Sequence, residues 1–365
     1  MRDLKQLKKK WSQMTSRDLF FVLNGEYPKL AFSEVISILQ ATERRYSNFT
    51  KFDQLTKITT SMDSVQVIAQ RSALVHRCCA HFFESGDTVE EIIENAKEMT
   101  IDNSLIFGKS FAVRIKRIKN YGAHIDKVEL ERQLGTVIFN HLEQVDKVMK
   151  VNLESPDIIF YGIFTENRFF FGLNLWKSET YSNRFDKRRG HKRAFFHPGT
   201  LEPRLARVLV NLSRIKENEL FLDPFSGSAS ILIEARLIGA NIIGSDIQEK
   251  MVQGAFVNLK QFNLSGNLIC ADARQLPFKD DIYAIATDPP YGRSSTTKGI
   301  ELNKLIQSFL GSATNVLQKK RYICICAPTH INLQTIANEI GFKTVELHKM
   351  RVHKSLTRII GVFQN

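Results

Sequence analysis

Long apolar runs are missing from this 365-residue sequence, and none approaches the ~20 residues that a membrane-spanning helix needs. The first residues, MRDLKQLKKKWSQ, lack the apolar core of a signal peptide. Internal repeats and low-complexity tracts are also absent, and 43% hydrophobic with 24% charged residues is typical of a soluble globular protein. We therefore expect a cytoplasmic protein with no membrane partner.

Cysteine is scarce, and its spacing does not fit a zinc knuckle or ribbon. The cysteines form an adjacent pair, a singleton and a C-x-C within an expected strand; they are Cys78, Cys79, Cys270, Cys324 and Cys326. This pattern predicts buried free thiols, not disulfides or metal ligands.

Two nucleotide-binding fingerprints are missing as well. The turn LDPFSGSASILIEA, at 222–235, is not G-x-G-x-x-G, and it lacks the lysine of a phosphate-binding P-loop. These absences count against NAD or ATP as ligands. Gly227 nevertheless lies at an expected strand-to-helix corner, where the missing side chain lets a ligand approach the backbone.

Positive charge is in excess, with a net charge of +13 and a pI near 9.5. Because Lys and Arg release counterions when they neutralise phosphates, this excess favours a polyanionic partner. The run SNRFDKRRGHKRAFFHPG, at 182–199, concentrates basic residues around the single acid Asp186. It is either a solvated linker or a segment that contacts phosphates, and Arg188 and Arg189 are our candidates for the second role.

The length predicts two or three domains. Up to about residue 165 the pattern is α+β: a basic lead at 1–16 expected to be mobile, a strand at 18–24, and a strand at 109–118 in which Arg114 and Lys116 alternate with apolar residues. From about residue 200, strands and helices alternate strictly and a strand pair closes the chain. This order predicts a doubly wound, Rossmann-like parallel sheet.

Four consecutive expected strands end in aspartate, namely Asp223, Asp246, Asp272 and Asp288. One such acid is an ordinary turn or cap residue, but four would gather at the carboxyl edge of the sheet, where open α/β sheets bind nucleotide-like ligands. At this edge Asp246 can accept hydrogen bonds from both hydroxyls of a ribose, and Asp272 from an adenine amino group. Asp288 opens DPPYG, whose two prolines make a stiff loop that is either a rigid turn or a site.

The series D-P-F-x-G-x, G-S-D, A-D-A and D-P-P-Y-G resembles the class I S-adenosylmethionine-dependent methyltransferases that act on exocyclic amino groups. The resemblance implies a cofactor site around the methionine, ribose and adenine of S-adenosylmethionine. The residues that it implies for this site are Thr200, Asp223, Phe225, Gly227, Asp246, Ile247, Asp272 and Ala273. Where the family has Cys, Thr and Gly, this sequence has Ser226, Ser228 and Ser230, which should leave the turn intact.

The first half is similar to the THUMP module of tRNA-modifying enzymes, which follows a small ferredoxin-like domain. The implied domains are 1–70, tail and ferredoxin-like; 71–165, THUMP; 166–196, basic linker; and 197–365, methyltransferase. Together with the H-P-G-T segment and DPPYGRSSTT, the chain most resembles the archaeal tRNA guanine-N2 methyltransferases acting at position ten. That resemblance implies tRNA as the partner and no need for an activating subunit. We expect a monomer, and from the charge pattern we expect Arg114, Lys116, Arg188 and Arg189 to contact the tRNA.

Methylation of a guanine amine would give the residues of the DPPY loop specific chemical roles. A guanine amine is a poor nucleophile because its lone pair is delocalised; if Asp288 and the Pro289 carbonyl each accept one of its hydrogens, that lone pair is freed. Pro290 stiffens the loop, and Tyr291 is expected to stack on the base. No metal is needed. Alternatives remain: another tRNA or rRNA guanine, adenine-N6 of DNA, which the THUMP-like half disfavours, or a non-catalytic RNA-binding protein.

Overall fold

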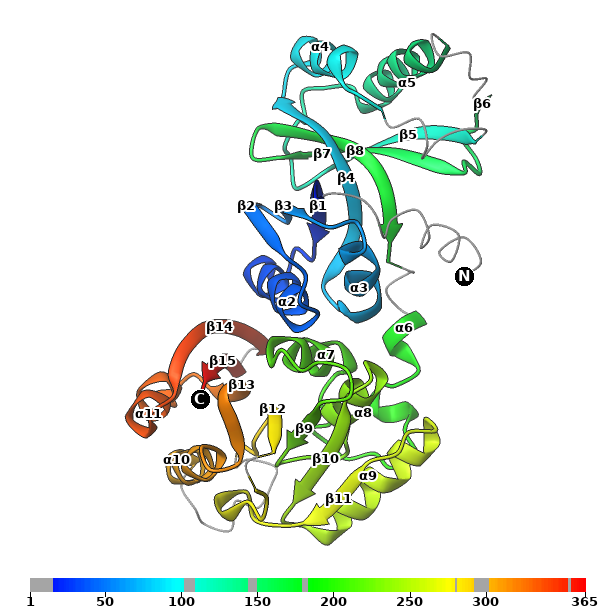
Figure 1. Cartoon of the computed structure of the whole chain (residues 1–365). Coiled ribbons are helices and arrows are strands. Elements are labelled where there is room, and N and C mark those ends of the chain that lie inside the picture. Colours follow the sequence, from blue (N-terminus) through cyan, green and yellow to red (C-terminus); the bar gives the residue numbers. More distant parts are fainter. Residues whose placement is uncertain are drawn as a thin grey trace. The chain divides into compact units, whose positions relative to one another are not determined.

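The computed structural model describes residues 16–101, 109–143, 150–178, 183–279, 281–291, 302–353 and 356–365. The chain divides into two compact units (Figure 1). The first comprises Met1–Phe32, Arg44–Ala69 and Val75–Ser178, and the second Ser33–Glu43, Gln70–Leu74 and Glu179–Asn365. The basic lead that the sequence predicts to be mobile lies outside the described residues, apart from Ser16. In the described ranges, every helix is too short or too polar to span a bilayer.

The first unit is built on an eight-stranded sheet with the order β2-β3-β1-β4-β8-β7-β5-β6. Its strands are β1 (Arg17–Leu23), β2 (Tyr46–Phe52), β3 (Leu55–Thr60), β4 (Val75–Gly86), β5 (Ser110–Arg117), β6 (Lys150–Val151), β7 (Ile158–Thr165) and β8 (Arg168–Lys177). Its helices are α2 (Pro28–Ala41), α3 (Ser64–Arg71), α4 (Val89–Glu98) and α5 (Lys127–Glu143); α2 and α3 each extend into the second unit.

The alternation predicted for 109–118 is confirmed in β5, where Phe111, Val113 and Ile115 are buried and Lys116 is exposed. The predicted strand pair after α5 is also confirmed. Strands β7 and β8 are antiparallel, and their turn residues Glu166 and Asn167 have φ values of 49° and 59°, which suit a two-residue hairpin turn.

The prediction of a basic linker at 166–196 is wrong for residues 168–177. Strand β8 pairs with both β4 and β7, so residues 168–177 lie inside the first sheet. The predicted boundary at residue 70 also falls within a continuous structure, because β1 pairs with β3 on one side and with β4 on the other.

The second unit is the predicted doubly wound sheet, with the order β11-β10-β9-β12-β13-β15-β14. Its strands are β9 (Leu220–Asp223), β10 (Asn241–Asp246), β11 (Asn267–Cys270), β12 (Ile282–Thr287), β13 (Leu317–Pro328), β14 (Lys343–His353) and β15 (Leu356–Gln364). Strands β9 to β13 are parallel, and β14 and β15 close the sheet as an antiparallel pair.

Helices cover both faces of this sheet (Figure 1). The helices of this unit are α6 (Asn183–Asp186), α7 (Pro203–Leu212), α8 (Ser230–Leu237), α9 (Glu249–Gln261), α10 (Leu302–Ala313) and α11 (Leu333–Ile340), with short 3-10 turns η2 (Gly190–Lys192) and η3 (Ala273–Gln275). On one face, Phe309 of α10 and Leu333 of α11 join Ile285, Ile323 and Phe363 of the strands in one apolar core. This core fixes the strands whose carboxyl ends carry the site.

Candidate functional site

Pairing of the parallel strands brings the predicted acids to one edge of the sheet. Asp223, the last residue of β9, lies opposite Gly244 of β10, and Asp246, the last residue of β10, lies opposite Cys270 of β11. Asp288 directly follows β12, which pairs with β9 on the side away from β10. Parallel strands place their carboxyl ends together, so the sequence prediction of a shared edge is confirmed.

Asp223 is buried at the centre of this edge, with 1% of its surface exposed. Its Oδ1 accepts a hydrogen bond from Thr287 Oγ1 at 2.7 Å and from the amide of Phe225 at 3.2 Å. Burial raises the pKa of this carboxyl to about 7, although both hydrogen bonds oppose the shift. Phe225 itself packs edge-on against Phe309, with ring centroids 5.2 Å apart.

The turn after β9 leaves an open cradle. Gly227 has φ +48°, and a Cβ added there would find no atom closer than Met251 Cε at 3.7 Å. The Gly227 amide donates to Asp246 Oδ2 at 3.1 Å. Helix α8 begins after Ala229, which supplies no side-chain cap, and the buried Ser226 hydroxyl has no hydrogen-bond partner. The turn therefore presents a helix N-terminus and an unpaired hydroxyl, which suits a polar ligand.

The segment before α7 supports the same turn through Ser228. The Thr200 and Ser228 hydroxyl oxygens are 3.0 Å apart. The Ser228 carbonyl accepts from Asn258 Nδ2 at 3.0 Å and from Arg193 Nη1 at 3.3 Å, and Arg193 also donates to Ser230 Oγ at 2.8 Å. Arg193 and Asn258 were not predicted from the sequence, because nothing local separates a buried arginine from its basic neighbours or a helical asparagine from a solvated one.

The remaining candidate cofactor residues lie along the next two strand ends. Asp246 accepts from the Gln248 amide at 2.9 Å, and burial raises its pKa. Ile247 is 46% exposed. Asp272 caps η3 and forms an ion pair with Arg274 at 2.5 Å, while Ala273 is buried.

The Asp288-Pro289-Pro290-Tyr291 loop holds its carboxylate from two sides. The Tyr291 hydroxyl donates to Asp288 Oδ1, and Arg358 Nη1 of β15 lies 3.4 Å from Oδ2. Burial raises the pKa of Asp288, against the opposing effects of Arg358 and Tyr291. Pro289 is buried and Pro290 half-buried. Gly292 and the RSSTT that follows lie outside the described residues.

The predicted RNA contacts fall in both units, with Arg114 and Lys116 on β5 of the first and Arg188 and Arg189 in the second. Lys116 is exposed, whereas the Arg114 guanidinium donates to the Leu153 carbonyl. Arg189 is half exposed and lies 3.6 Å from Asp186. The expectation that Arg188 contacts RNA is corrected by its position. Its side chain is only 13% exposed, and it donates to both oxygens of the fully buried Glu234, at 2.6 and 3.2 Å.

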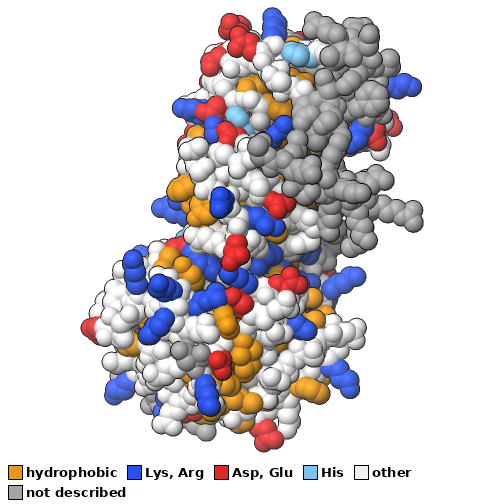
Figure 2. All heavy atoms as spheres, viewed as in Figure 1, with side chains coloured by type: hydrophobic (Ala, Val, Ile, Leu, Met, Phe, Trp, Pro, Cys, Tyr) orange, Lys and Arg blue, Asp and Glu red, His pale blue; other side chains and the backbone are white. Residues whose placement is uncertain are grey.

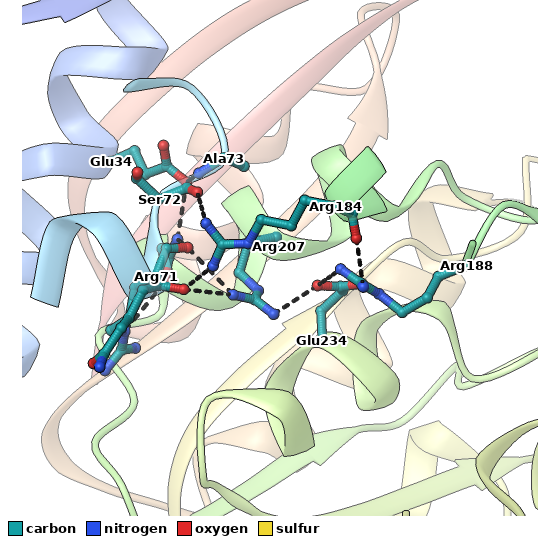
Figure 3. Close-up of polar contacts among 10 residues, drawn as sticks. Glu34, Arg71, Ser72, Ala73, Arg184, Arg188, Arg207 and Glu234 are labelled. Carbon is teal, nitrogen blue, oxygen red and sulfur yellow. Dashed lines mark hydrogen bonds and ion pairs between the residues drawn. The ribbon is translucent and has the colours of Figure 1, made fainter. Parts of the chain in front are cut away.

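Arg188 belongs to a buried polar network of the second unit (Figure 3). Arg207 Nη2 lies 2.8 Å from Glu234 Oε2, the oxygen that Arg188 Nη2 also contacts, and its Nη1 lies 3.4 Å from the Arg71 carbonyl. Glu34 accepts from the amides of Ala73 and Leu74 at 2.9 and 2.8 Å. The charge run therefore contains structural arginines that satisfy buried groups of other segments.

Of the five cysteines, four are buried free thiols as predicted, but Cys270 is exposed at the end of β11. The described residues contain no group of three His, Cys, Asp or Glu side chains that could hold a metal ion.

Comparison with known proteins identifies relatives over almost the whole chain. It is 33% identical to the tRNA (guanine(10)-N2)-dimethyltransferase of Methanothermobacter thermautotrophicus, with 95% of this chain and 99% of the relative covered. The proteins of the same name from Methanocaldococcus jannaschii and Pyrococcus abyssi are each 31% identical, over 94% and 95% of this chain and 99% of each relative.

Family models and solved structures agree with a methyltransferase fold. A family described as "RMKL-like, methyltransferase domain" matches residues 190–360, and one described as "DNA methylase" matches residues 53–257. The crystal structure of TrmN from Thermus thermophilus is similar at a TM-score of 0.52 and 19% identity, covering 96% of this chain and all of that one. SMU.472, a putative methyltransferase complexed with SAH, has a TM-score of 0.51 at 14% identity, covering 97% and 99%.

Proposed function

Because the chain belongs to the methyltransferases, and among them to the family of the tRNA (guanine(10)-N2)-dimethyltransferases, we propose that it methylates the exocyclic N2 amine of guanosine at tRNA position ten. The observation that carries the proposal is the position of Asp288. Its carboxylate ends β12 at the sheet edge where Asp223 and Asp246 end the neighbouring strands.

The residues at this edge fit S-adenosylmethionine. The cradle at Gly227, with the uncapped α8, the unpaired Ser226 hydroxyl and the Ser228 hydroxyl beside Thr200, suits the charged methionine end, and Asp223 suits its ammonium. Asp246 would accept the ribose hydroxyls. Adenine would then meet Asp272 and the Ala273 backbone, with the side chains of Phe225 and Ile247 as apolar contacts.

The cofactor supplies a methyl group on a positively charged sulfur, so that no metal is required. Asp288 and the Pro289 carbonyl would each accept one hydrogen of the guanine amine and free its lone pair, while Pro290 and Tyr291 hold the base. N2 then forms the new bond to carbon, the electron pair of the broken C–S bond stays on sulfur, and one proton leaves N2 to the Asp288 carboxylate or to solvent. The base must first be extruded from its helix.

Basic residues would hold the tRNA. On the face drawn in Figure 2, Lys and Arg side chains are spread over both units, in keeping with the net charge of +13. We assign RNA contacts to Lys116, Arg114 and Arg189, and we interpret the first unit as the ferredoxin-like and THUMP regions. The protein acts as a cytoplasmic monomer without an activating subunit.

Transfer to purified substrates tests this proposal. The full chain is incubated with labelled S-adenosylmethionine and unmodified tRNA transcript, and the nucleosides are then analysed by mass spectrometry. N2-methylated guanosine that disappears when position ten is changed supports enzyme, substrate and site together, and N2,N2-dimethylguanosine reports a second transfer.

The same assay separates the alternatives. Methylation of rRNA, or of another tRNA guanosine, would change the substrate that is assigned to the enzyme. Methylation of adenine in a DNA oligonucleotide would favour the DNA methylases, whose family model matches residues 53–257. Cofactor binding without transfer to any substrate would point to a non-catalytic RNA-binding protein.

A further inference from the structure

Arg358 lies beside the proposed acceptor carboxylate, although it is 70 residues away in the sequence. It belongs to β15, where it pairs with Pro328 of β13 and with Met350 of β14. Its side chain is 12% exposed, and Asp288 is 14% exposed. The closing antiparallel pair therefore places the buried guanidinium of Arg358 at the sheet edge where the parallel strands end in acidic residues.

The guanidinium of Arg358 is directed at the DPPY loop. Its Nη1 lies 3.4 Å from Asp288 Oδ2, and its central carbon lies 5.3 Å from the centroid of the Tyr291 ring. Its Nε is buried and finds no hydrogen-bond partner among the described residues. Burying an arginine costs free energy unless its charge is compensated, and Asp288 supplies that compensation here.

A carboxyl group accepts hydrogens from an amine best when it is ionised, because the protonated form keeps only part of its acceptor capacity and presents its own donor to the substrate. Burial works against ionisation of Asp288, since it raises the pKa of this group. A cation within ion-pair distance favours the charged form. The Tyr291 hydroxyl occupies Oδ1 on the other side, so the two contacts together fix the plane of the carboxylate.

We propose that Arg358 is a positioning residue for Asp288, whose guanidinium holds the carboxylate ionised and in a fixed orientation for the guanine amine. The inference rests on the proposed function, because it assumes that Asp288 receives the amine. Arg358 does not contact the base in this account and acts only through Asp288.

Other titratable groups also face Asp288. Tyr291 follows it in the loop, Cys326 lies on β13, and Asp223 ends β9; each interacts electrostatically with Asp288. Burial raises the pKa of Cys326 far above neutrality and that of Asp223 to about 7. Asp223 therefore titrates in the range of interest, and activity measurements alone would not separate it from Asp288.

The test compares Arg358→Gln and Arg358→Lys with the wild-type full chain and with Arg351→Gln, an exposed arginine of β14. Two quantities are measured: kcat for tRNA as a function of pH, and the ionisation of Asp288 without substrate, by NMR of ¹³C-carboxyl-labelled aspartate assigned with Asp288→Asn. We expect Arg358→Gln to move the Asp288 titration and the acidic limb of kcat upward by about 1–3 pH units. Arg358→Lys should move both less, and Arg351→Gln neither.

Equal Asp288 titrations in the wild type and Arg358→Gln would overturn the inference, as would a kcat reduced by the same factor at every pH. If Arg358→Gln does not fold, Arg358→Met decides, because it also removes the charge while its apolar side chain suits a buried position; an unmoved titration there contradicts the inference. If the wild type transfers no methyl group, the proposed function fails, whereas the NMR titration still reports on Arg358.

Discussion

Burial raises the pKa of Asp223 to about 7, and this shift should be visible in the pH dependence of stability. An unfolded aspartate titrates near ~3.9, so between about pH 4 and 7 the native state binds the extra proton. The stabilisation from this group is therefore complete below about pH 4 and is lost as the pH rises through 7.

We predict that Asp223→Asn removes this contribution, because an amide does not titrate and its oxygen can still accept from Thr287. The free energy of unfolding is measured from pH 4.5 to 8 for both proteins. As the pH rises, the free energy of unfolding of the wild type should fall relative to that of the variant. Asp281→Asn, at an exposed position, is the control, and the same pH dependence in both variants would contradict the assignment.

Which single residues could be predicted from the sequence depends on how local their signal is. Asp223, Asp246 and Asp288 were predictable because each one ends or directly follows an apolar strand. Arg358 was not, because only the antiparallel return of β15 brings it to the same edge. Arg188 was predicted as an RNA contact since its neighbours are basic, and the sequence gives no sign that it reaches Glu234.

At the scale of elements, the segment from α6 to η2 is attached to helix α8 through Arg188 and Glu234. We predict that Arg188→Glu lowers the free energy of unfolding by about 3–5 kcal/mol, because it leaves two carboxylates together in a buried site. Arg189→Glu should cost less than about 1 kcal/mol, since Arg189 is half exposed. Urea denaturation of the two variants measures both values, and equal costs would contradict the account.

Arg189→Glu is also the variant that tests RNA contact in this segment. Because this variant should keep its fold, its RNA affinity can be compared with that of the wild type across salt concentrations. We expect the variant to bind RNA more weakly and with a shallower salt dependence. Unchanged affinity at all salt concentrations would remove Arg189 from the proposed interface.

At the scale of the whole molecule, the second unit is not a continuous stretch of chain. Asn211 of α7 donates to Glu34 at 2.8 Å and to the Arg71 carbonyl at 3.0 Å, and Arg71 in turn donates to the Ile215 carbonyl at 2.8 Å. We predict that a fragment of residues 179–365 is unstable, because buried groups lose the partners that Ser33–Glu43 and Gln70–Leu74 provide. Circular dichroism and thermal melting of the fragment test this, and a cooperative melt like that of the full chain would contradict it.

The same interlacing limits what the sequence predicts about architecture. The strict alternation of strands and helices after residue 200 was sufficient for the doubly wound sheet and its closing pair. The domain boundaries were not predictable, because α2 and α3 carry apolar patterns that suit either unit and β8 returns to a sheet begun much earlier. Periodicity reports which face of an element is buried and does not report which partner covers it.

The most direct measurement of the central claim compares Asp288→Ala with wild type in two assays on the same preparations. Calorimetry measures the affinity for S-adenosylhomocysteine, and nucleoside mass spectrometry measures methyl transfer to tRNA. Since Asp288 is assigned to the amine and not to the cofactor, transfer should fall by about 100-fold or more, while cofactor affinity stays within about twofold of wild type. Turnover retained by Asp288→Ala would contradict the account.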